Sequence, residues 1–117
     1  MEHIFIDLDK AFYAPEIAFT LHDLIMIGDY KWPQDATCLT QECDGEIIWW
    51  SAPVEEVISA RQRANLDDGL IPLIGLGQQI DSNYFHFRGQ AVIASDWQKA
   101  VVTLEQIEEA PIYGRIR

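Results

Sequence analysis

Basic residues are scarce in this 117-residue chain, above all in its first half. The sequence has 8 Lys and Arg against 19 Asp and Glu, a formal net charge of −11. Residues 1–60 hold twelve acids and two bases and carry −10, whereas residues 61–117 hold seven acids and six bases and carry −1. This balance argues against direct binding to nucleic-acid phosphates or to anionic membranes, which attract Lys and Arg. A basic surface of another protein is the complementary partner.

Cysteines and long apolar runs are also few. No run approaches the ~20 apolar residues of a transmembrane helix, and the first residues lack the basic and apolar regions of a signal peptide. These absences predict a cytoplasmic protein. Cys38 and Cys43 fall on opposite faces of one expected strand, and His3, His22 and His86 form no close pair. The spacing disfavours a disulfide and a zinc site, so we expect free, part-buried thiols and no metal or cofactor.

Apolar residues make up 49% of the sequence, which is enough for one core in a chain of this length. Asp44-Gly45 lies between two apolar and aromatic segments, 37–43 and 46–51, and predicts a hairpin with a type I′ turn. Pairing Leu39 with Trp50 puts Trp49 and Trp50 on opposite faces of the sheet. We expect one of them in the core, with the other either beneath a helix or exposed as an anchor.

Period-two alternation near the start, a Pro-Glu pair at 15–16 and a Thr103/Gln106 capping box define further elements. The expected elements are a strand over 4–8, helices over 14–27 and 53–65, a second hairpin over 83–94 around Arg88-Gly89, a strand over 100–103 and a helix over 104–110. Residues 24–27 could instead be a short strand. Together they predict a single α+β domain over 1–117, a mainly antiparallel sheet of hairpins packed by two to three helices.

The segment Phe5-Ile6-Asp7-Leu8-Asp9 is similar to the first motif of haloacid-dehalogenase-type phosphatases, in which a strand-end aspartate attacks phosphate. The similarity implies an alternative function, a small Mg-dependent phosphate-handling enzyme that uses Asp7 and Asp9. Lys10-Ala11-Phe12 replaces the Gly-Thr turn of that family, and the chain is short for its doubly wound fold. Two acids on the exposed face of an edge strand are the simpler interpretation, since charge there discourages edge pairing.

The acidic surface remains as the main functional hypothesis. Its carboxylates would meet a basic groove on another protein or imitate nucleic-acid phosphates, and a nearby tryptophan would supply an apolar anchor. The residues expected to bind the partner are Asp35, Glu42, Asp44, Glu46, Trp49, Glu55 and Glu56. The alternative is that these charges only keep the protein soluble. A homodimer is also open.

Two segments resemble parts of small uncharacterised proteins encoded by tailed bacteriophages and prophages. The first is a hairpin, Trp32-Pro33-Gln34-Asp35-Ala36-Thr37 through Asp44-Gly45-Glu46 to Trp49-Trp50, and the second a closing segment, Ser95-Asp96-Trp97 through Val101-Val102-Thr103 to Gln106. These motifs contain turn residues, caps and aromatics, which carry no reaction. The resemblance implies a noncatalytic phage accessory protein in a bacterial host cell, for example an inhibitor of a host protein. A toxin-immunity protein, which would be equally acidic, is the further alternative.

Overall fold

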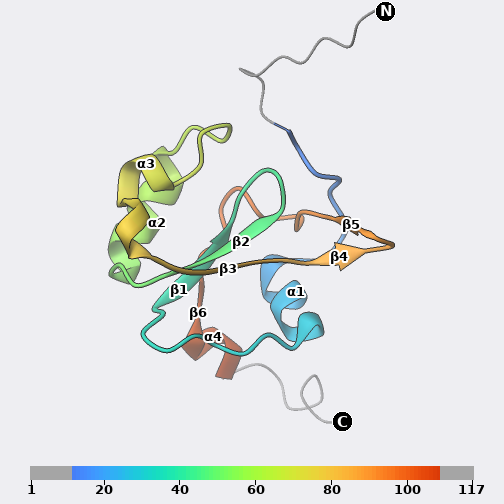
Figure 1. Cartoon of the computed structure of the whole chain (residues 1–117), viewed down its shortest axis with the longest axis horizontal. Helices are drawn as coiled ribbons and strands as arrows, with labels where there is room; N and C mark the ends of the chain where they lie inside the picture. The colour runs from blue at the N-terminus through green and yellow to red at the C-terminus, as the bar shows by residue number, and fades with distance from the viewer. Residues whose placement is uncertain (1–11, 109–117) are drawn as a thin grey trace, which may run out of the picture.

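The computed structural model describes residues 12–108, so the strand expected over 4–8, with Asp7 and Asp9, lies outside the described residues. Residues 12–108 form a four-stranded antiparallel sheet, a separate two-stranded hairpin and four α-helices (Figure 1). The α+β class predicted from the sequence is confirmed. None of the helices in this part of the chain has the length and apolar character needed to cross a membrane.

The four-stranded sheet has the order β3-β2-β1-β6. Its strands are β1 (Cys38–Gln41), β2 (Glu46–Trp50), β3 (Gln79–Tyr84) and β6 (Val102–Thr103), and each neighbouring pair is antiparallel. β1 and β2 form the hairpin expected over 37–51. The sheet therefore grows outward from the segment with the clearest turn signal in the sequence.

The turn of this hairpin differs from the prediction. Leu39 pairs with Trp49 rather than with Trp50, a shift of one residue. The Glu42 N–H donates to the Glu46 carbonyl at 2.8 Å, and the Gly45 N–H donates to the Glu42 carbonyl at 2.9 Å. φ is +100° at Gly45 but is not positive at Asp44, so the connection is a three-residue loop with one left-handed glycine. The prediction of a type I′ turn was therefore wrong. The side chain of Asp44 accepts the Glu46 N–H at 3.0 Å, which stabilises the observed loop instead.

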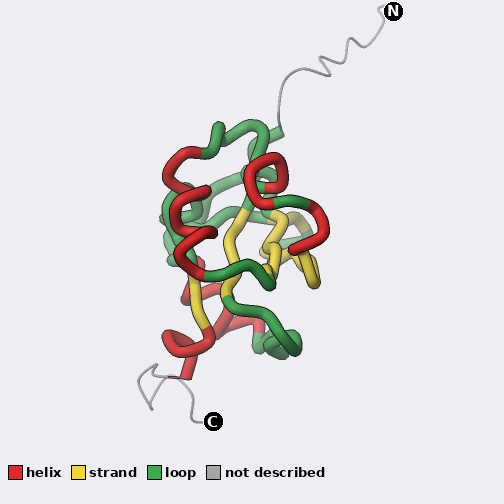
Figure 2. The backbone as a smooth tube through the Cα atoms, turned by 90° about the vertical axis from the view of Figure 1, so that its left-hand side faces the viewer, coloured by secondary structure: helices red, strands yellow, loops and turns green. Residues whose placement is uncertain are grey.

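Trp49 and Trp50 lie on opposite faces of the sheet, as predicted, and both are buried. Trp49 packs in a cluster with α1 (Leu21–Gly28), Ile47 and Trp97, whereas Trp50 packs in a second cluster with Cys38, Ile48 and α2 (Val54–Arg63). Figure 1 shows α2 and α3 (Ile71–Ile74) on one side of the strands and α1 on the other, and the side view of Figure 2 places α2 and α3 in front of the strands. The sheet thus separates two apolar clusters.

The first helix begins later than expected, at Leu21 rather than near residue 14. Thr20 caps it: its hydroxyl accepts the Asp23 N–H, and the Asp23 carboxylate accepts the Thr20 N–H. Residues 14–17 pair with other segments instead: the Ala14 N–H donates to the Cys43 carbonyl, and Glu16 forms an isolated parallel bridge with Ile93 through hydrogen bonds from the Ile17 N–H to the Ile93 carbonyl and from the Ile93 N–H to the Pro15 carbonyl. The alternative strand over 24–27 is wrong, since these residues belong to α1.

The remaining expected elements are found with changed lengths. α2 lies within the predicted 53–65, and the connection that follows contains two short elements not expected from the sequence, α3 and a 3₁₀ turn, η1 (Leu76–Gln78). β4 (His86–Phe87) and β5 (Gln90–Ala91) pair around Arg88-Gly89, as expected, but residues 83–84 pair with β2 instead. α4 (Leu104–Glu108) follows β6, and Thr103 and Gln106 form the predicted capping box.

Candidate functional site

The residues predicted to bind a partner are divided between the two ends of the β1–β2 hairpin. Glu42, Asp44 and Glu46 surround the turn. Glu55 and Glu56, in the first turn of α2, lie at the open end, where the Thr37 N–H donates to the Trp50 carbonyl and the Thr37 hydroxyl to the Ala52 carbonyl. Asp35 is also at that end, in the turn before β1. The two groups are separated by the length of β2, about 17 Å for five residues.

Trp49, the predicted apolar anchor, belongs to the core. Its side chain is 1% exposed, and its ring meets the Tyr30 ring in an edge-to-face contact with centroids 5.7 Å apart. The indole therefore has no surface to offer a partner. Trp32 and Tyr30 are each half-buried against the same cluster.

Two acids from a distant segment join the group at the turn. Asp67 and Asp68 follow α2 and line the same hollow of about 310 Å³ as the three hairpin carboxylates. We call this set the hairpin-end cluster: Glu42, Asp44, Glu46, Asp67 and Asp68. Neither Asp67 nor Asp68 was predicted to bind the partner, because 21 positions separate Asp67 from Glu46 in the chain. The neighbouring Gly69 was the local signal of a close approach.

Gly69 brings the segment after α2 against the hairpin. Its φ is +76°, and a Cβ atom there would lie 2.1 Å from Oε1 of Glu42. The next residue, Leu70, donates its N–H to Oε2 of Glu42 at 3.4 Å. Only glycine fits this position without moving the carboxylate, so Gly69 fixes the distance between the two halves of the cluster.

Three of the other four carboxylates of the cluster contact hydroxyl groups. Oε2 of Glu46 accepts the Ser82 hydroxyl at 2.6 Å, and Oδ1 of Asp67 accepts the Tyr13 hydroxyl at 2.5 Å. Oδ2 of Asp44 lies 3.5 Å from the Tyr84 hydroxyl. These contacts restrict the side chains before any partner arrives, which lowers the entropy lost on binding.

Burial, hydrogen bonding and the negative charge of the cluster raise the pKa of three groups in it or beside it. Burial raises the pKa of Glu42, and Glu46 and Asp44 add to the effect, while Arg61 opposes it. The hydrogen bond to Asp67 is the main reason that the pKa of Tyr13 is raised to about 12. Burial, followed by Asp44 and Glu42, raises the pKa of the Cys43 thiol. A thiol in this field stays protonated and is a poor nucleophile.

Exposed aromatic rings border the hollow. Phe12, which lines it, is 68% exposed, and Tyr13 and Tyr84, bound to cluster carboxylates, are 44% and 41% exposed. Aromatic faces attract Lys and Arg side chains, and carboxylates pair with the same groups. The arrangement can therefore receive a cationic side chain through both kinds of contact.

The carboxylates do not converge as metal ligands. Within residues 12–108, no group of three or more His, Cys, Asp or Glu side chains is arranged to hold a metal ion. Cys38 and Cys43 are buried as free thiols, on opposite sides of the sheet, in agreement with their predicted divergence. Comparison of the chain with protein-family models, with curated proteins and with solved structures finds no match.

Proposed function

We propose that this chain is a noncatalytic acidic binding protein of phage or prophage origin, whose hairpin-end cluster engages a basic surface of a host protein in the bacterial cytoplasm. The observation that carries the proposal is the convergence of five carboxylates, from residues 42–46 and 67–68, on one hollow bordered by exposed aromatic rings. The partner would be inhibited by occlusion of that basic surface.

The carboxylates and the exposed aromatic rings together favour a protein partner that has Arg or Lys at the centre of its binding surface. The negative field speeds the encounter at low ionic strength, and aromatic contact supplies the part of the free energy that salt does not screen. Asp68 is exposed and has no hydrogen-bond or ion-pair partner among residues 12–108, so its carboxylate is available to a cation. Glu55 and Glu56, at the other end of the hairpin, contribute only to the long-range field.

Two charge-matched variants test this assignment of the site. Glu46→Lys/Asp68→Lys reverses two charges in the hairpin-end cluster, and Glu55→Lys/Glu56→Lys reverses two at the open end. Each full-length protein is immobilised and used to capture partners from a bacterial lysate at low and at physiological salt. We expect Glu55→Lys/Glu56→Lys, the control, to capture the same partner as the wild type. Glu46→Lys/Asp68→Lys should capture much less of it, and the remaining binding should depend less on salt.

Equal capture by the two variants would contradict the proposed site. Displacement of the captured protein by duplex DNA would identify it as a nucleic-acid-binding protein and the cluster as a phosphate mimic. Phosphomonoester hydrolysis that requires Mg²⁺ and is abolished by Asp7→Asn would overturn the noncatalytic assignment.

A further inference from the structure

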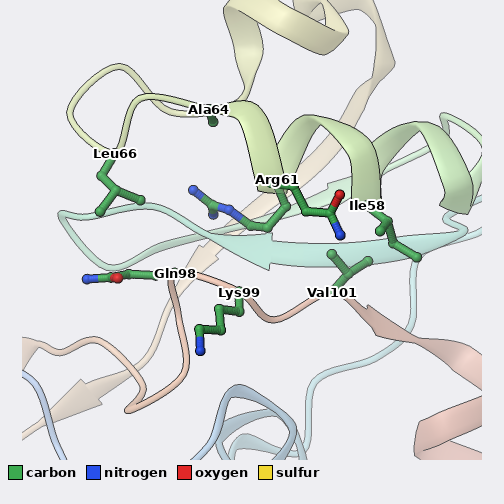
Figure 3. Close-up of a pocket in the computed structure, with 8 residues that line it drawn as sticks. Ile58, Arg61, Ala64, Leu66, Gln98, Lys99 and Val101 are labelled. Atoms are coloured by element: carbon green, nitrogen blue, oxygen red, sulfur yellow. The ribbon is translucent and has the colours of Figure 1, made fainter.

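A second hollow, of about 620 Å³, shares no lining residue with the hollow of the acidic cluster. It is bounded by α2, by the residues that follow it and by the segment before β6 (Figure 3). Its volume falls in the range of small-molecule sites, which run from roughly 300 to 1,000 Å³. Its apolar walls are Ile58, Ala64, Leu66 and Val101.

Both charged residues that line this hollow are positive. The polar lining residues are Arg61, Gln62, Gln98 and Lys99, with no carboxylate among them. Lys99 is exposed, and its ammonium group has no hydrogen-bond or ion-pair partner among residues 12–108. Glu42 interacts electrostatically with Arg61 but does not line the hollow. In a protein of net charge −11, a hollow lined by two cations and no acid is suited to an anion rather than to the basic partner of the acidic cluster.

Arg61 is the most informative residue of the hollow. It is 4% exposed, its Nη1 donates to the Gln41 carbonyl at 2.9 Å, and its guanidinium lies 5.8 Å from the centre of the Trp97 ring. Nε and Nη2 have no hydrogen-bond partner among the described residues. Buried donors of a charged group are almost always satisfied, because leaving them unpaired costs several kcal/mol. The unpaired Nε and Nη2 of Arg61 therefore indicate that an acceptor from outside the described residues can bind there.

The geometry of the unpaired nitrogens indicates the shape of that acceptor. Nε–H and Nη2–H lie along one edge of the guanidinium and form the fork that binds two oxygens of a carboxylate or phosphate. Figure 3 shows the Arg61 guanidinium reaching from α2 toward Leu66 and Gln98, and the Lys99 side chain extending from the segment before β6 with its ammonium group directed away from the guanidinium. Both nitrogens are shielded from solvent, so side chains around the guanidinium must shift to admit a ligand.

We propose that this hollow binds a small organic anion, a carboxylate or a phosphate monoester carried on an apolar group. The fork of Arg61 holds the charged end, and Lys99 adds a second cation at the rim. Ile58, Leu66 and Val101 cover the apolar end. Gln41 and Trp97 are positioning residues, since they fix the guanidinium without facing the ligand.

The experiment uses the full chain with benzoate and phenyl phosphate as probes, at constant ionic strength adjusted with sodium chloride. Thermal unfolding measures stabilisation, and amide NMR shifts locate binding. We expect saturable stabilisation by at least one probe, with shifts at Leu66, Gln98 and Val101, and none by the neutral analogue benzamide. The stronger of the two probes identifies the head group. Inorganic phosphate should bind more weakly than phenyl phosphate.

Three exposed positions supply variants that leave the core intact. Gln98→Glu places a carboxylate beside the fork and should weaken binding about tenfold, equivalent to ~1.4 kcal/mol. Lys99→Gln should weaken it less, and Lys31→Gln, which removes the same charge outside the hollow, should bind as the wild type does. Arg61→Lys keeps the charge but loses the fork, and its binding should fall further.

Several outcomes would overturn the proposal. They are the absence of stabilisation by both probes up to millimolar concentrations, equal stabilisation by benzamide, equal binding of inorganic phosphate and phenyl phosphate, and unchanged affinity in Gln98→Glu. The result does not depend on Arg61→Lys being folded, because Gln98 and Lys99 are exposed.

Discussion

At the scale of single residues, Glu42 and Arg61 connect the acidic cluster to the interior. Glu42 is part-buried beside Asp44 and Glu46, and burial is the largest cause of its raised pKa. Arg61 favours the charged carboxylate but forms no hydrogen bond with it, since its one described bond goes to the Gln41 carbonyl. Glu42 is therefore a carboxylate that the fold holds at some cost.

The raised pKa of Glu42 gives a pH prediction with a definite sign. A carboxyl that binds its proton more tightly in the folded state adds stability below its unfolded pKa, and this contribution is lost as pH rises through the higher folded pKa. Glu42→Gln should thus be more stable than the wild type at neutral pH, and the difference should vanish as pH falls from the raised value toward the ordinary 4.5. Urea unfolding across this window measures it. A variant less stable than the wild type at neutral pH would contradict the prediction.

At the scale of elements, the close approach of Gly69 to Glu42 joins the segment after α2 to the hairpin turn. Gly69→Ala adds a Cβ 2.1 Å from the Glu42 carboxylate at a φ of +76°. We expect a loss of about 1–3 kcal/mol in the free energy of unfolding. Gly77→Ala is the matched control, because nothing lies within 4 Å of its Cβ position, and it should change stability by about 0.5 kcal/mol or less. Equal effects in urea unfolding would contradict this docking.

Local signals predicted the elements better than they predicted the site. Both hairpins and the Thr103 cap depend on a few adjacent residues and are found in the structure, although the first hairpin closes with a three-residue loop instead of the predicted type I′ turn. The start of α1 was missed because Pro15 resembles a first-turn proline, whereas its carbonyl accepts the Ile93 N–H. Asp67 and Asp68 were missed because only tertiary packing brings their segment to the hairpin. No sequence pattern marks that contact except the glycine itself.

At the scale of the whole molecule, the net charge of −11 sets a cost on the folded state. Like charges brought together by folding repel, and salt screens this repulsion over a Debye length of about 10 Å at 0.1 M. We expect sodium chloride to raise the free energy of urea unfolding by roughly 1 kcal/mol between low and physiological ionic strength, the scale of a few screened exposed pairs. The Glu46→Lys/Asp68→Lys variant should show a smaller rise. A fall in stability with salt would indicate that attractive pairs dominate instead.

Trp49 and Trp50 are adjacent in the chain yet fill separate apolar clusters. A shift of β2 by one residue against its neighbours would move each indole to the opposite face of the sheet and disrupt both apolar clusters. A shifted register could not keep one cluster well packed while disrupting only the other. The central strand therefore has one workable setting, and the placement of every carboxylate at its turn is inherited from that choice.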